Sequence, residues 1–239
     1  MVNVMVYTSC LWTRTSNNYL RKGSVMGMDV YGLNPKKRVK KSQEFKDILS
    51  KYGEKEGMFL DWNKKIPKDV MQKYYDIKEQ YEQDNPGIYF RNNVWWWRPL
   101  WDYVCVACPD ILTERDYREG HSNSGRRISK TKSKRIAARL RKLVKDGTVK
   151  DAEIVNAEMR GEAIRHNTKV DAKLEQLRLD MIKMTGDKNI APKDYPNKYR
   201  KQWANIYGES KGIANYPFSE KNVIRFISFC DDSGGFEIC

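Results

Sequence analysis

The stretch FRNNVWWWRPLW, residues 90–101, carries four tryptophans within seven positions. Three consecutive indoles cannot share one side of a strand or a helix, because successive side chains point in different directions in both. Each buried indole removes roughly 150–250 Å² from water and needs a partner for its N–H. The stretch therefore predicts a strand or turn at the centre of the core, covered on both faces.

The alternative interpretation of the same stretch is a stacking surface for a base, a nucleotide or a peptide, with arginines beside it. His121, in the turn-like sequence GHSNSG at residues 120–125, could join such a pocket and supply acid–base or metal chemistry. This hypothesis predicts a small-ligand-binding protein or a metal-dependent enzyme. Its candidate ligand-binding residues are Asp29, Arg91, Asn92, Trp95, Trp97, Arg98 and His121.

Helical periodicity dominates the chain on both sides of this stretch. Pro99 is expected to block helix before it, so that a short helix follows at residues 102–109. Ser129 is expected to cap a helix over residues 128–146, and a second long helix is expected over residues 151–184. The stripe expected to be buried on the second helix runs through Ile154, Ala157, Gly161, Ile164, Leu174, Leu177, Met181 and Met184.

Strand signals are few. Residues 29–32 suggest a short strand that ends in a glycine turn, and residues 236–239 suggest an edge strand that returns after the last helix. The sequence therefore predicts a mainly α (α+β) fold, in which a single helical domain carries a small two- or three-stranded β element.

The chain divides into three regions by composition and periodicity. Residues 1–25 show no period of 2 or 3.6, and are expected to form either a poorly ordered arm or a non-native extension that precedes a start at Met26 or Met28. Residues 26–239 are expected to form the helical domain. Within it, residues 36–87 have nearly balanced charge and two helical patterns, and are interpreted as a helical insertion.

Four segments resemble a family of small uncharacterised proteins from bacteriophages and some bacteria. They are residues 26–35 (MGMDVYGLNP), 89–101, 120–147 and 233–239 (SGGFEIC), which together cover about half of the chain. The resemblance implies a viral setting and a start at Met26 or Met28, and it supplies no activity and no catalytic residue. It leaves open an accessory protein or a structural or interaction protein of the virion.

The charge distribution is the main sequence signal for a partner. The net charge is +14, and residues 126–145 alone hold ten basic and no acidic side chains. A local excess of this kind is typical of polyanion binding, here through phosphates and without strong sequence specificity. The alternative is a solvated face that acidic groups such as Glu153, Glu158 and Glu162 balance. The candidate nucleic-acid-binding residues are Arg126, Arg127, Lys130, Lys134, Arg135, Arg139, Arg141, Lys142 and Lys145.

The remaining signals narrow the class of protein. An odd number of cysteines, five, does not suggest a disulfide framework, and no apolar run approaches the roughly 20 residues of a membrane span, so a cytoplasmic protein is expected. Cys105 and Cys108 with His121 are weak candidates for zinc, against small apolar packing of the two thiols in a helix. No cofactor is otherwise predicted. Because no nucleotide-loop, nucleophile-elbow or paired-histidine motif is present, a non-enzymatic protein that binds nucleic acid or an acidic protein is favoured.

Overall fold

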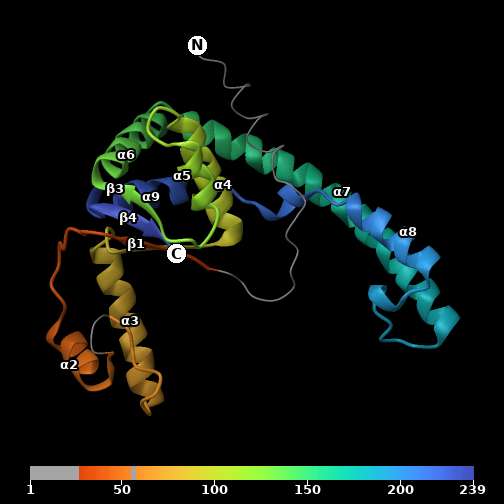
Figure 1. Cartoon of the computed structure of the whole chain (residues 1–239), viewed down its shortest axis with the longest axis horizontal. Helices are drawn as coiled ribbons and strands as arrows, with labels where there is room; N and C mark the ends of the chain where they lie inside the picture. The colour runs from red at the N-terminus through yellow and green to blue at the C-terminus, as the bar shows by residue number, and fades with distance from the viewer. Residues whose placement is uncertain (1–26, 55–57) are drawn as a thin grey trace.

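The structure, a computed structural model, describes residues 27–54 and 58–239; the expectations for residues 1–25 lie outside that part of the chain. The fold is mainly α with one small sheet, as predicted, although the sheet has four strands where two or three were expected (Figure 1). The α-helices are α2 (Gln43–Tyr52), α3 (Lys68–Asp84), α4 (Val94–Ala107), α5 (Glu114–Gly120), α6 (Lys130–Lys145), α7 (Thr148–Thr185), α8 (Asn197–Gly208) and α9 (Glu220–Asp232). The strands are β1 (Gly27–Gly32), β2 (Tyr89–Asn93), β3 (Arg126–Ser129) and β4 (Gly235–Ile238), and short 3-10 turns are η1 (Pro192–Asp194) and η2 (Gly212–Asn215).

Within the described residues the sheet has four strands in the order β2-β1-β4-β3, each antiparallel to its neighbours. Two expectations were wrong here. Strand β4 is internal, because Ile238 pairs with Val30 of β1 on one side and Phe236 pairs with Ile128 of β3 on the other. Strand β3 replaces the expected first turn of the basic helix, because buried Ile128 alternates with exposed Arg127 in the strand period of two.

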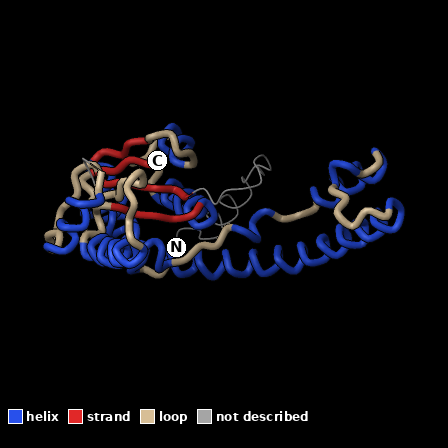
Figure 2. Tube along the Cα trace, turned by 90° about the horizontal axis from the view of Figure 1, so that it is seen from below, coloured by secondary structure: helices blue, strands red, loops and turns tan. Residues whose placement is uncertain are grey.

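Helices α4, α6 and α9 cover one face of this sheet, and α7 with α8 forms an arm that extends away from it (Figures 1 and 2). The inward strand side chains, such as Val30, Phe90 and Phe236, meet Phe226 and Phe229 of α9 in the main hydrophobic core. The described residues of 36–54 and 58–87 contain a separate hydrophobic cluster, formed by Phe45, Leu60, Tyr74 and Tyr81.

The tryptophan stretch is a strand followed directly by a helix. Asn93 ends β2 and caps α4, because its side chain accepts a hydrogen bond from the Trp96 N–H at 3.1 Å. Helix α4 therefore begins before Pro99, contrary to the expected block. The proline ring fits helical φ and removes only one N–H bond, in the second turn, while the buried tryptophans hold the helix to the core.

The three consecutive indoles point in three directions around α4. Trp97 is fully buried and stacks on Trp101, one helical turn away, with ring centroids 5.5 Å apart and planes at 10°. Trp95 is half-buried against Tyr216, and Trp96 is exposed. The prediction of a core position is therefore confirmed for Trp97 and Trp101, in a helix and not in a strand or turn.

Helix α7 runs unbroken for 38 residues, and its buried face differs from the predicted stripe. Ile154 and Ile164, expected to be buried, are 48% and 47% exposed. The buried residues at its core-facing side follow a seven-residue spacing, because η2, α8 and α9 pack on that side. They are Val149, Asn156, Ala163, Val170 and Leu177, and Ala152 and Met181 are buried beside them, so the predicted stripe is confirmed at Leu177 and Met181. Asn156 was missed because an amide is not expected in a core; its side chain bonds Phe218 N and Tyr216 O.

Candidate functional site

A groove of about 430 Å³ opens where β2 and α4 meet the beginning of α9. The described residues that line it, which we call the Trp96 groove, include three cations and no carboxylate. They are Arg91, Asn92, Asn93, Trp96, Ser219, Lys221, Asn222 and Arg225. Cations beside an exposed indole are the chemistry of anion and nucleotide recognition.

Two helices begin at this groove. Asn93 is the N-cap of α4, and Ser219 is the N-cap of α9, where its hydroxyl accepts a hydrogen bond from Asn222 N at 3.2 Å. The first N–H groups of both helices have no partner inside the helix, and the positive ends of both helix dipoles lie here. The capped helix ends therefore add positive potential to that of the side chains.

Two buried asparagines form the floor of the groove. Asn92 Nδ2 donates to Asn222 Oδ1 at 3.2 Å, and the two residues are only 8% and 7% exposed. In the described part of the chain this is the one side-chain hydrogen bond of the pair, so one amide N–H₂ and one amide carbonyl keep hydrogen-bonding capacity. That capacity suits a polar ligand, because a ligand in the groove could bond the amide atoms that the pair leaves free.

Among the described residues, Arg91 is the one groove cation that forms an ion pair with a carboxylate, and this pair is long and exposed. Arg225 lies over the ring of Phe90, 5.4 Å from its centroid. Arg91 Nε is 3.8 Å from Asp29 Oδ1, beyond hydrogen-bond distance, and its side chain is 67% exposed. Asp29 instead accepts a hydrogen bond from Tyr89, and burial, followed by this bond, raises the pKa of Tyr89.

The basic surface of β3 and α6 is different, because most of its cations hold a carboxylate. The alternative interpretation, a basic face balanced by acidic groups, therefore holds for most of these cations. The carboxylates that balance them are not Glu153, Glu158 and Glu162, which the sequence suggested. The pairs are Arg126 and Lys132 with Asp116, Arg126 with Glu119, Arg127 with Glu237, Arg135 and Arg139 with Asp110, and Arg141 with Asp231; Lys134 donates to the Asp231 carbonyl.

Besides Lys134, which bonds only a backbone carbonyl, three candidate cations of this surface form no ion pair with a carboxylate that the structure describes. Within residues 27–54 and 58–239, no salt bridge joins Lys130, Lys142 or Lys145 to a carboxylate. Lys142 and Lys145 lie in the last turn of α6, and Lys130 begins its first turn. The polyanion-binding capacity of residues 126–145 is therefore smaller than their ten basic side chains suggested.

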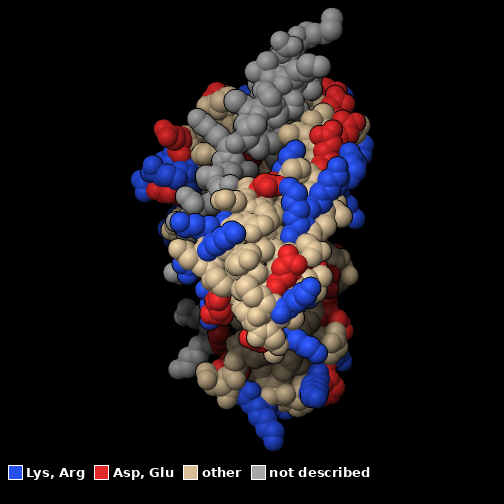
Figure 3. Space-filling model, turned by 90° about the vertical axis from the view of Figure 1, so that its right-hand side faces the viewer, with Lys and Arg blue, Asp and Glu red and all other residues tan. Residues whose placement is uncertain are grey.

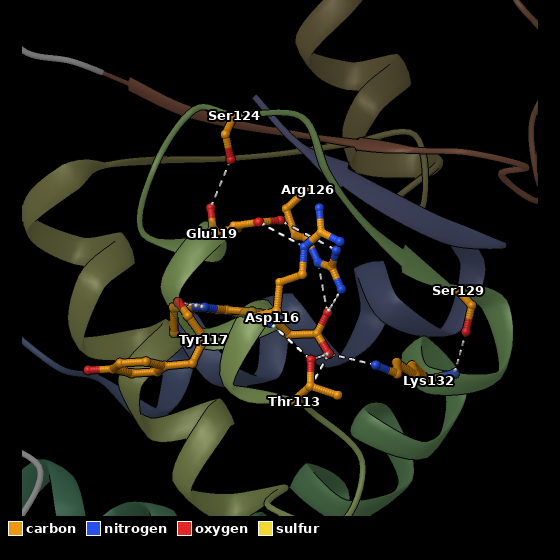
Figure 4. Close-up of polar contacts among 10 residues, drawn as sticks. Thr113, Asp116, Tyr117, Glu119, Ser124, Arg126, Ser129 and Lys132 are labelled. Carbon is orange, nitrogen blue, oxygen red and sulfur yellow. Dashed lines mark hydrogen bonds and ion pairs between the residues drawn. The ribbon is translucent and has the colours of Figure 1, made fainter.

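Asp116 of α5 is the central carboxylate of this surface (Figure 4). Its side chain is fully buried and accepts hydrogen bonds from Thr113 N at 2.8 Å, Arg126 Nε at 2.8 Å and Lys132 Nζ at 2.5 Å. Burial alone would raise the pKa of Asp116, but the bonds from Lys132, Thr113 and Arg126 outweigh it and hold the pKa well below its usual range. This cluster fastens β3 and α6 to α5, a structural role.

The predicted ligand set is not brought together. Arg91 and Asn92 line the groove, whereas Trp97 is buried and its indole donates to Gly120 O at 2.7 Å. Arg98 Nη1 donates to the Tyr216 hydroxyl at 2.9 Å, and the Trp95 ring packs on Tyr216.

His121 faces the core side of α4. His121 Nε2 is 3.0 Å from Asp102 Oδ1, without the alignment of a hydrogen bond, and its ring packs edge-on against Tyr117. Neither Asp29 nor His121 lines the Trp96 groove. The pocket expected to unite Asp29, Arg91, Trp97 and His121 therefore does not form.

The cysteines fit the packing alternative better than the zinc candidate. Cys105 and Cys108 are free thiols in and beside the end of α4, and burial raises the pKa of both, that of Cys108 to about 12. In the part of the chain that the structure describes, no three His, Cys, Asp or Glu side chains come together as a metal site. Thiols with raised pKa are poor metal ligands, because the ligand is the thiolate.

The arm carries a different charge pattern. At the end of the molecule where α7 and α8 lie, Lys and Arg alternate with Asp and Glu over the visible surface (Figure 3). Such a surface makes no single-sign field for a polyanion. Across the described helices, none combines the length and apolar character that a membrane crossing requires.

Comparisons with protein-family models, with curated proteins and with solved structures found no match to this chain. The class of protein is therefore described by its own fold and groove. It is a mainly α protein with an antiparallel sheet and a basic groove, which is bordered by a tryptophan and lies at two helix N-termini. The bacteriophage resemblance stays a prediction.

Proposed function

We propose that this protein binds nucleic acid through its phosphates, with the Trp96 groove as the principal contact. One observation supports the proposal most: the described lining of the groove holds Arg91, Lys221 and Arg225 and no acidic side chain. In contrast, most of the cations on β3 and α6 together are already paired with carboxylates. Unpaired cations gain the most from a phosphate, since no existing ion pair is broken.

The groove offers a phosphate two kinds of contact. Lys221 and Arg225 are four residues apart on α9 and therefore lie on the same face of the helix. The first N–H groups of α9 point toward the same end, where the helix dipole favours negative charge. Side-chain and backbone donors thus converge, as expected for binding to phosphate oxygens without reading sequence.

The free lysines at the end of α6 lie toward the same end of α9 as the groove. Ser133 Oγ, near the start of α6, donates to Cys230 O near the end of α9 at 2.7 Å. Phe218 N, just before α9, donates to Asn156 Oδ1 of α7, which follows α6 directly. Helices α6 and α9 therefore run antiparallel. This places the end of α6, with Lys142 and Lys145, toward the end of α9 that forms the groove.

The charge-reversal variant Lys221→Glu/Arg225→Glu is expected to lose nucleic-acid affinity by more than tenfold at low salt. Glutamate at position 221 suits a helix N-terminus, so α9 should stay folded. Fluorescence anisotropy with a labelled oligonucleotide measures the loss. The slope of log K against log salt should shrink by about 1.4 for single strands, since roughly 0.7 counterions are released per phosphate contact.

The matched control is Lys193→Glu/Lys201→Glu, which changes the net charge equally but on the exposed arm. It should reduce affinity only slightly, through the overall field. Equal losses in both variants would refute the groove as the principal contact. Absence of binding by the wild-type chain at low salt would refute the proposed function itself.

A further inference from the structure

We infer that the Trp96 groove accepts an unpaired nucleotide, so that the protein selects single-stranded over duplex nucleic acid by stacking a base on Trp96. This inference rests on the proposed function and names the form of nucleic acid that the groove fits. It draws on the indole, the size of the groove, its asparagine floor and the arrangement of its cations.

The backbone of Trp96 is fixed in α4, whereas its indole ring is accessible to solvent. It sits in the first turn of α4, where its N–H is bonded by the Asn93 cap, and it is 36% exposed. Its neighbours Trp95 and Trp97 pack on Tyr216 and Trp101 and so fix the helix that presents it. A rigid, exposed indole needs little ordering on binding, and stacking on any base is favourable because every base has a π-face.

The size of the groove favours one nucleotide. Its volume of about 430 Å³ lies within the range of roughly 300–1,000 Å³ that is usual for small-molecule pockets. A base inside a duplex is stacked and paired on both sides and cannot reach the indole without flipping out, which costs a few kcal/mol. An unpaired base avoids that cost, so the same contacts give tighter binding to a single strand.

The floor of the groove adds polar recognition beside the stacking. The Asn92–Asn222 pair lines the groove and retains an amide donor and an amide carbonyl acceptor, although both residues are otherwise buried. Asparagine amides bond base edges that are splayed out of a helix. A phosphate alone could not bond the amide carbonyl, because a phosphodiester and a carbonyl both carry only hydrogen-bond acceptors. A base carries donors as well as acceptors, so it could bond both the amide N–H₂ and the carbonyl.

The cations come from two elements that border the indole. Arg91 belongs to β2, and Lys221 and Arg225 belong to α9. Backbone phosphates on either side of one nucleotide could therefore be held while its base rests on Trp96. This combination of a basic groove and a stacking platform is how single strands are bound without strong sequence preference.

The test compares four labelled ligands with equal numbers of phosphates in anisotropy titrations at low salt. They are a thymidine single strand, a duplex, a single strand of abasic sites, and inorganic polyphosphate. The wild-type chain is expected to bind the thymidine strand about tenfold or more tighter than the abasic strand, because stacking on an aromatic side chain contributes roughly this factor per base. The duplex should bind more weakly than the thymidine strand.

The variants Trp96→Ala and Trp96→Phe separate stacking from charge. Trp96→Ala should lose about tenfold in affinity for the thymidine strand and little for polyphosphate, while Trp96→Phe should recover part of the loss. Trp62→Ala is the control, because Trp62 is 65% exposed in the segment between α2 and α3. It should bind all four ligands like the wild type, and circular dichroism should be the same for all three variants.

The outcomes separate the two proposals. Equal binding of thymidine and abasic strands, or of duplex and single strand, would overturn the stacking inference and leave phosphate binding in place. Unchanged thymidine affinity in Trp96→Ala would overturn it as well. Failure of every polyanion to bind would overturn both proposals together.

Discussion

Asp116→Ala is expected to lower the free energy of unfolding by about 3–5 kcal/mol, the usual cost of removing one partner from a buried ion pair. Asp116 has no exposed side-chain surface, and its two oxygens bind the side chains of Thr113, Arg126 and Lys132. After the substitution, Arg126 and Lys132 keep their charges with only 19% and 29% of their side chains exposed. The capping box of α5 is lost as well.

Urea denaturation followed by far-ultraviolet circular dichroism measures this loss. Asp110→Ala is the matched control, because Asp110 also binds two arginines, Arg135 and Arg139, but its side chain is 50% exposed. Exposed pairs contribute little, since water and salt screen them. We expect the Asp110 variant to unfold close to the wild-type midpoint. Similar midpoints for both variants would contradict a special role for the buried carboxylate.

The pH dependence supplies a second readout for Asp116. Its folded-state pKa lies below that of an unfolded aspartate, which is about 3.9, so folding favours the ionised form. The resulting stabilisation is present above the unfolded pKa and is lost as the pH falls toward the folded pKa. The stability difference between the wild type and Asp116→Asn should therefore be constant near neutral pH and narrow below about pH 4.

Local signals in the sequence predicted local structure well. Ser129 caps α6 through Lys132 N, as predicted, and the same spacing is visible in the sequence at Thr113 with Asp116, which form the capping box of α5, and at Ser219, which caps α9. Each signal depends on contacts within three or four residues, and sequence spacing contains that information. The start of α4 was missed because the local effect of Pro99 was weighed without the Asn93 cap.

The sheet order and the groove depended on contacts between distant segments. Strand β4 became internal only because β3, some 100 residues earlier in the chain, pairs with its second edge. The groove joins residues 91–96 to residues 219–225, and no periodicity relates the two. Lys221 and Arg225, at helical spacing after the Ser219 cap, were the available hint. Arg91 and Asn92 were predicted, but Trp95 and Trp97 were chosen over Trp96, since α4 was expected to be a strand.

Adjacent tryptophans of the stretch are therefore expected to have different roles, with Trp97 in the core and Trp96 at the ligand. The variant Trp97→Ala should accordingly lose much of its stability. Trp97 is fully buried, stacks on Trp101, meets Phe226 edge-on at 5.9 Å and donates its N–H to Gly120 O. Truncating a buried tryptophan costs about 3–5 kcal/mol, through lost contacts and the cavity that remains. Here the Gly120 carbonyl also loses its indole donor.

The surroundings of Trp97 leave little room to relax into that cavity. Trp101 is itself fully buried and closely packed, since a Cβ added at Gly120 would lie only 2.1 Å from Trp101 Nε1. The expected cost thus lies in the upper part of the range, because it rises with the volume that the neighbours cannot refill. Urea denaturation should give a much lower midpoint for Trp97→Ala than for Trp96→Ala, whose indole is partly exposed. Equal midpoints for these two neighbours would contradict the opposite orientations that assign Trp97 to the core and Trp96 to the ligand.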